Sequence, residues 1–139
     1  MSYDLMVFEP NSAPRERVSF MGWYQQQTKW GEEHSYDDPK VASPALQLWF
    51  QEMIEFFPPM NGPLASDLDT PEVTDHCIGR DVIYSAFAWS VASGAYAKMR
   101  ELAIKHNVGF FDVSESEGEI LFPNTPSNPG AKERWWKFW

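Results

Sequence analysis

Four consecutive apolar residues near the N-terminus constrain the fold of this chain more than any other feature. Leu5 to Phe8 lie in residues 3–10, a short stretch rich in strand formers that Pro10 ends. A half-exposed strand alternates between apolar and polar residues, whereas a strand buried on both faces forms a continuous apolar run. We therefore expect residues 3–10 to form a central strand of a sheet.

Two helices are expected after this strand. Residues 14–33 carry a broad apolar side, Ser12 is placed to cap the helix, and Pro14 suits its first turn. A second helix is expected to start at Ser43 and Pro44, a capping residue followed by proline at the first helical position. Its apolar residues recur at steps of three and four, as on one face of a helix: Leu46, Trp49, Phe50, Met53 and Phe57.

The second half of the chain predicts a hairpin, a third helix and two short strands. Residues 73–78 and 82–89 have the composition of strands, with Gly79 at the turn between them. Ser90 is placed to cap a helix that ends near Asn107. The two remaining apolar stretches predict the last strands, residues 108–114 and 119–122.

This order of elements predicts a single α+β domain over residues 1–123. Hairpins imply antiparallel pairing, so we expect a four- to five-stranded antiparallel sheet with helices on one face. A ferredoxin-like arrangement is the specific prediction. Residues 124–139 are expected to form a linker and an aromatic tail outside the domain.

The charge balance narrows the class of partner. The chain has 20 acidic and 11 basic residues and a net charge of −9, so phosphate backbones and anionic membranes should repel it. No signal peptide and no apolar run of membrane-spanning length is recognisable. Cys77 is the single cysteine, which suits a reducing compartment. We expect a cytoplasmic protein whose partner is a basic protein, with no nucleic acid and no membrane bound.

The sequence carries no recognisable catalytic, metal or cofactor motif. Asp75, His76 and Cys77 are adjacent, but neighbouring side chains of a strand point to opposite faces, so His76 should not activate Cys77. Cys77 is instead expected to be a small core residue on the same face as Asp75. The histidines lack the spacing of metal ligands. We expect no enzymatic activity, no cofactor and no metal.

Acidic loops are the best candidates for contacts with a partner. Residues 58–72 hold four prolines and a glycine, and a loop of this length in a compact domain is usually functional or mobile. Arg80 and Asp81, at the predicted hairpin turn, are expected either to pair locally or to contact the partner. The acidic candidates are Asp37, Asp38, Asp67, Asp69 and Glu72.

Several blocks of sequence together resemble a family of small bacterial proteins. The blocks are YDLMVFEP, WYQQQTKW, SPALQLWFQEMIEFFPPMNGP, IYSAFAWS and HNVGFFDVS, and they cover most of residues 3–114. The resemblance implies an immunity protein, encoded beside a polymorphic secreted toxin. From the small size, the acidity and the lack of a catalytic motif we expect such a protein to bind and neutralise the toxin by occluding its active site. The family has no motif that marks catalytic residues, so the resemblance assigns none.

Two other functions remain open at this point. One is a small enzyme with a site between residues 58–72 and the sheet, for which the candidate residues are Asp75, His76, Asp81 and Tyr84. The other is a ligand-binding or oligomeric module that uses a face of the sheet. A thermal-shift screen with small molecules and a mass measurement in solution distinguish this module from an immunity protein.

The tryptophans divide by context. Trp23, Trp49 and Trp89 lie in patterned elements and are expected in the core, whereas Trp30 suits core or surface. Three more lie in the tail, and a helix from residue 131 would place them on one apolar face: Trp135, Trp136 and Trp139. Such a face should not stay in water. We expect it to cover the protein's own domain, or else to bind a partner or a second copy in a homo-oligomer.

Deletion of residues 131–139 separates these two roles of the tail. If the tail covers its own domain, the deletion should lower the melting temperature, because apolar surface becomes exposed to water. If the tail binds a partner, the melting temperature should stay unchanged while binding is lost. Circular dichroism and a binding assay on the same variant measure both quantities.

Overall fold

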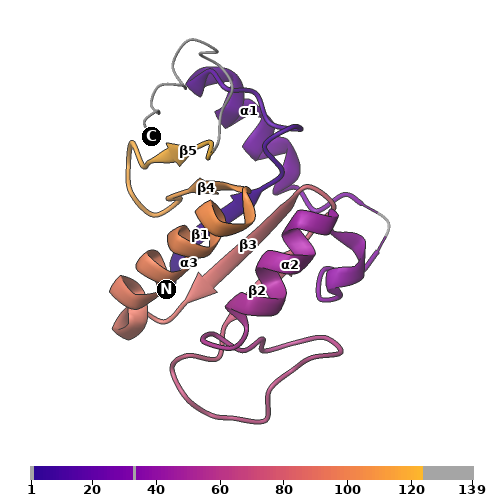
Figure 1. Ribbon diagram of the computed structural model, residues 1–139, viewed down its shortest axis with the longest axis vertical. Coiled ribbons are helices and arrows are strands. Elements are labelled where there is room, and N and C mark those ends of the chain that lie inside the picture. Colours follow the sequence, from indigo (N-terminus) through magenta and orange to yellow (C-terminus); the bar gives the residue numbers. More distant parts are fainter. Residues whose placement is uncertain (1, 33, 124–139) are drawn as a thin grey trace.

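The computed structural model describes residues 2–32 and 34–123, which alternate between strands and helices (Figure 1). Trp135, Trp136 and Trp139 lie outside the described residues. In chain order the elements are β1 (Tyr3–Phe8), α1 (Arg17–Gln27), the 3-10 turn η1 (Pro39–Val41), α2 (Pro44–Met53), β2 (Asp75–Ile78), β3 (Val82–Phe87), the 3-10 turn η2 (Trp89–Val91), α3 (Ala92–His106), β4 (Gly109–Phe111) and β5 (Ile120–Leu121).

Five antiparallel strands form one sheet in the order β2-β3-β1-β4-β5. β1 pairs with β3 along its whole length, from Tyr3 opposite Phe87 to Phe8 opposite Val82. The central position predicted for the first strand is therefore confirmed. The predicted α+β class is also confirmed: β1, α2, β2, β3, α3 and β4 follow the β-α-β-β-α-β order of ferredoxin-like folds, and β5 extends the sheet at one edge.

The larger core lies between the sheet and the two helices α2 and α3, which cover one face together (Figure 1). β1 contributes Leu5 and Val7 to this core, and α2 contributes the fully buried Trp49. The indole N–H of Trp49 donates a hydrogen bond to the carbonyl of Met99 in α3, at 3.3 Å. The apolar stripe predicted for α2 is confirmed, because its members pack here: Leu46, Trp49, Phe50, Met53 and Phe57.

A second, smaller core lies on the opposite face of the sheet. β1 directs Met6 and Phe8 into it, and α1 covers them with Phe20, whose ring centroid lies 5.0 Å from that of Phe8 and 5.2 Å from that of Phe111. The prediction that helices lie on one face thus holds for α2 and α3, while α1 lies on the other. The physical reason is that Met6 and Phe8 are apolar and also need to be covered.

The ends of α1 differ from the prediction. The helix begins after Glu16, whose carboxylate accepts the backbone N–H groups of Val18 and Ser19 at 3.0 Å each, so Ser12 is not its cap. It ends at residue 27 rather than near residue 33, and Trp30 then adopts a left-handed conformation with φ +52°. Glu16 caps the helix in place of Ser12, and its carboxylate accepts two backbone N–H groups at once.

Two expectations about residues 89–107 are corrected and one is confirmed. Ser90 does not cap α3, because η2 precedes the helix without a side-chain cap. Trp89 is 53% exposed, and its ring centroid lies 5.1 Å from that of Tyr3, so it is not a core residue. Trp23, also expected in the core, is half-buried. Asn107 ends the helix with φ +61°, as predicted.

The contrast between Trp49 and Trp89 is testable. Replacement of Trp49 by alanine should lower the free energy of unfolding by about 3–5 kcal/mol, because it empties the larger core. The matched variant Trp89→Ala should lose about 1 kcal/mol or less, since half of that side chain is already in water. Urea denaturation followed by circular dichroism measures both, and equal losses would contradict this assignment of the core.

Candidate partner-binding surface

The loop of residues 58–72 projects from the end of the molecule where α2 ends and β2 begins (Figure 1). Its base is held by backbone hydrogen bonds beside the edge of the sheet. The N–H of Thr74 donates to the carbonyl of Pro58 at 2.8 Å, and the N–H of Met60 donates to the carbonyl of Thr74 at 2.9 Å. Ser66 donates its N–H to the carbonyl of Pro59 at 2.8 Å. The loop is thus anchored although most of its residues are exposed.

A glycine brings this loop against the segment that precedes η1. Gly62 has φ +92°, and a Cβ at this position would lie 2.1 Å from the carbonyl oxygen of Asp37. Only glycine combines the left-handed backbone with so close an approach. Asp37, one of the predicted contact residues, therefore lies beside the base of the loop.

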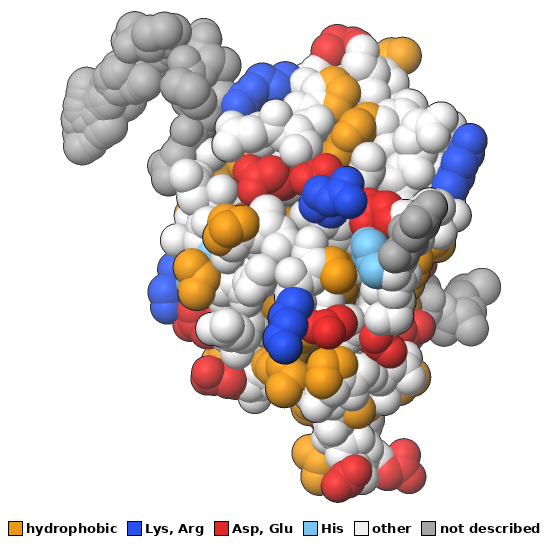
Figure 2. Space-filling model, turned by 90° about the vertical axis from the view of Figure 1, so that its right-hand side faces the viewer, with side chains coloured by type: hydrophobic (Ala, Val, Ile, Leu, Met, Phe, Trp, Pro, Cys, Tyr) orange, Lys and Arg blue, Asp and Glu red, His pale blue; other side chains and the backbone are white. Residues whose placement is uncertain are grey.

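The loop presents negative charge and apolar side chains together. Asp67, Asp69 and Glu72 are all exposed. No lysine or arginine occurs between Lys40 and Arg80 in the sequence, while acidic residues recur throughout. Figure 2 shows the result from the side, where a narrow projection at the bottom carries acidic and hydrophobic side chains. The loop of residues 58–72 itself therefore carries acidic side chains and no basic ones.

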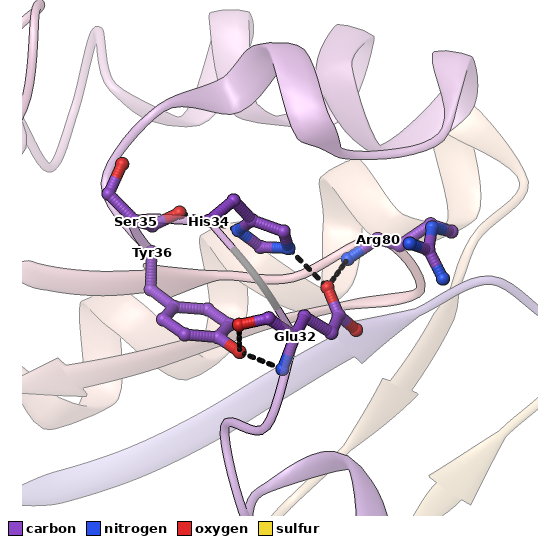
Figure 3. A network of polar contacts seen from close by, with 5 residues as sticks. All are labelled: Glu32, His34, Ser35, Tyr36 and Arg80. Atoms are coloured by element: carbon purple, nitrogen blue, oxygen red, sulfur yellow. Dashed lines mark hydrogen bonds and ion pairs between the residues drawn. The ribbon is translucent and has the colours of Figure 1, made fainter.

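A second polar network fastens the segment before Asp37 to the β2–β3 turn (Figure 3). The carboxylate of Glu32 accepts the backbone N–H of Arg80 at 3.2 Å and contacts the ring Nε2 of His34. The hydroxyl of Tyr36 accepts the N–H of Glu32 at 2.6 Å, and the carbonyl of Tyr36 accepts the N–H of Ile78 at 2.8 Å. This network, the Glu32 latch, positions Arg80 and the approach to Asp37.

The Glu32 latch also perturbs His34. The pKa of His34 is raised, first by its contact with the carbonyl of Ser35 and then by Glu32. A raised folded-state pKa means that the charged ring stabilises the fold fully below the ordinary histidine pKa, and that this contribution is lost as pH rises through the raised value.

Asp38 and Asp81 both have structural contacts. The carboxylate of Asp38 accepts the N–H of Lys40 at 3.0 Å and caps η1. Asp81 accepts the hydroxyl of Ser12 at 3.2 Å. Among the ion pairs of the described residues none joins Arg80 to Asp81, so their local pair does not form. Their contact with a partner stays a prediction.

Three of the residues considered for an enzyme are divided between the two faces of the sheet. His76 is buried on the face covered by α2, where its Nε2–H donates to the carbonyl of Phe57 at 3.0 Å and its Nδ1 accepts the hydroxyl of Ser85 at 2.7 Å. Burial lowers the pKa of His76 to about 4, so the ring is neutral. Asp75 and Tyr84 lie on the opposite face because of the strand alternation, and the hydroxyl of Tyr84 donates to Asp4 at 2.5 Å.

Cys77 is not activated, and the described residues hold no cluster of metal ligands. Cys77 is half-buried, and its thiol pKa is raised by burial and then by Asp75, so the thiol stays protonated at neutral pH. It shares a face of β2 with Asp75, as predicted. The expectation that Cys77 is a core residue is wrong, because it is only half-buried and belongs to neither core. Within residues 2–32 and 34–123, no group of three or more histidine, cysteine, aspartate or glutamate side chains could hold a metal ion.

A hollow of about 400 Å³ lies where β1 ends and α2 begins, lined among others by Glu9, Arg15, Ala45 and His106. Its lining includes none of the residues considered for an enzyme and none of the predicted contact residues. This hollow is therefore separate from the surface formed by the loop of residues 58–72.

Comparisons with protein-family models, with curated proteins and with solved structures found no match. In the part of the chain that the structure describes, no helix is both long enough and apolar enough to cross a membrane.

Sequence reasoning missed the residues that shape this surface. The Glu32 latch depends on contacts between residues that are far apart in the chain, such as Glu32 and Arg80, and no local pattern reveals such contacts. Gly62 was visible as a loop glycine, but its approach to Asp37 was not. Leu64 and Leu68 are not among the predicted contact residues. The signal that indicates them in the sequence is the presence of two large apolar residues among acids in a proline-rich loop.

The role of Gly62 is testable by substitution. Gly62→Ala should lower the free energy of unfolding by about 1–3 kcal/mol, because the new Cβ meets the carbonyl of Asp37 and the backbone is strained. Gly22→Ala is the matched control: a Cβ there meets nothing within 4 Å in α1, so stability should rise by about 0.5–1 kcal/mol. Urea denaturation measures both; an unchanged Gly62→Ala variant would refute the close approach.

Proposed function

We propose that this protein is an immunity (antitoxin-type) protein that binds a cognate secreted bacterial toxin and blocks its active site. The single observation that carries the proposal is the anchored loop of residues 58–72, which projects from the domain with exposed acidic and apolar side chains. An anchored projection is suited to enter a cleft, and a charged one selects a partner of opposite sign.

The overall charge supports the same function. A net charge of −9 speeds the encounter with a basic protein and disfavours acidic ones. The resemblance of the sequence blocks to immunity proteins points the same way. Such a protein acts in the cytoplasm of the producing cell, where the toxin is made. Occlusion requires binding alone, which agrees with the separation of His76 from Asp75 and Tyr84 on the two faces of the sheet.

Co-expression tests this function. The toxin encoded by the adjacent gene should arrest growth when expressed alone and should not do so when this protein is co-expressed. The purified pair should form a complex whose dissociation constant rises by about tenfold or more between 50 and 500 mM NaCl, because salt screens the attraction between an acidic and a basic protein.

Calorimetry at several salt concentrations measures this dependence. The matched control is a toxin domain from an unrelated gene, which should neither bind nor be neutralised. Growth arrest that persists at equal expression of both proteins, together with no complex at 50 mM NaCl, would refute the proposal.

A further inference from the structure

The loop of residues 58–72 exposes large apolar side chains that the fold does not use. Met60, Leu64 and Leu68 are 50%, 49% and 63% exposed, and none belongs to either core. Single exposed leucines are ordinary on a protein surface. Three such side chains in one fifteen-residue loop, with Leu68 between two aspartates, form a local concentration that folding does not explain.

The segment that carries the two leucines has its own hydrogen bonds. The N–H of Ala65 donates to the carbonyl of Gly62 at 3.1 Å, and the N–H of Leu68 donates to the hydroxyl of Ser66 at 3.0 Å. With the bond from Ser66 to Pro59, these contacts set the path of residues 59–68. A loop with a preset path loses less conformational entropy when it binds, so more of the contact energy appears as affinity.

The charges around the leucines define what can receive them. Asp67 and Asp69 flank Leu68, and Glu72 follows in the same loop. A receiving cleft must bury two aliphatic side chains and place cationic groups around them, because unpaired buried carboxylates are costly.

We infer that residues 60–72 form a wedge that enters a lysine- and arginine-lined cleft of the partner, with Leu64 and Leu68 as apolar anchors and with Asp67, Asp69 and Glu72 paired to its cationic rim. This inference rests on the proposed function and assigns it to one element. The leucines hold the complex together, and the carboxylates direct the encounter. Such a division is typical of interfaces, where a few buried side chains carry most of the affinity.

Two loop variants and two matched controls test the wedge against the toxin domain of the adjacent gene. The apolar variant is Leu64→Ala with Leu68→Ala, and its control is Val18→Ala with Ile104→Ala, exposed residues of α1 and α3. The acidic variant and its control each remove three exposed charges: Asp67→Asn, Asp69→Asn and Glu72→Gln in the loop, against Glu101→Gln, Glu115→Gln and Glu117→Gln elsewhere.

The two loop variants should fail in different ways. Loss of the leucines should raise the dissociation constant about 30-fold or more and leave its salt dependence unchanged. Loss of the carboxylates should lower the association rate constant and make the dissociation constant depend less on salt concentration. Both controls should stay within about threefold of the unmodified protein. Circular dichroism melts show that each variant is folded, and loop residues outside both cores should leave the melting temperature nearly unchanged.

The outcomes separate the wedge from the function. If the unmodified protein neutralises the toxin and the loop variants bind as tightly as their controls, the wedge is wrong and the immunity function stands. If the unmodified protein neither binds nor protects, both are wrong. If the leucine variant fails and the control binds normally, the wedge is supported.

Discussion

The burial of β1 on both faces is the constraint on which the rest of the structure depends. Leu5 and Val7 pack under α2 and α3, while Met6 and Phe8 pack under α1, and all four are fully buried. β4 approaches so closely that a Cβ on Gly109 would lie 2.2 Å from the ring of Phe8. A strand without a solvent-facing position needs a layer on each side, so the sheet cannot be stable with one helical layer alone.

The candidate binding loop inherits its position from this core. His76, buried under α2, links the hydroxyl of Ser85 in β3 to the carbonyl of Phe57, the residue before the loop begins. With a pKa lowered from 6.5 to about 4, the neutral ring favours the fold above pH 6.5, and its contribution declines as pH falls toward 4. A histidine that suggested catalysis from the sequence thus serves as an anchor of the loop.

The sequence predicted those parts of the fold that depend on local patterns. The apolar run of β1, the cap and proline that start α2, and Asn107 at the end of α3 were all readable, because each reflects the chemistry of neighbouring residues. The start of α1 was misplaced because Glu16 competes with Ser12 as a cap, and no rule on residue type ranks the two in this context. Trp89 was misplaced because periodicity does not show that β3 ends before it.

The candidate surface was predictable in its charge and not in its shape. The acids of residues 67–72 were visible as residues, but their support comes from Gly62 against Asp37 and from Thr74 against Pro58. Such contacts bring distant segments together through the tertiary fold. Leu64 and Leu68 likewise belong to neither core, and only the tertiary structure shows this.

Hydrogen exchange of the complex tests the central claim most directly. The backbone amides of residues 60–72 are on an exposed loop, and they should become strongly protected when the toxin domain of the adjacent gene is bound. The turn of residues 113–118, another acidic segment, at the β4–β5 connection, should exchange at the same rate with and without the toxin. Protection at residues 113–118 with no change at residues 60–72 would contradict the account.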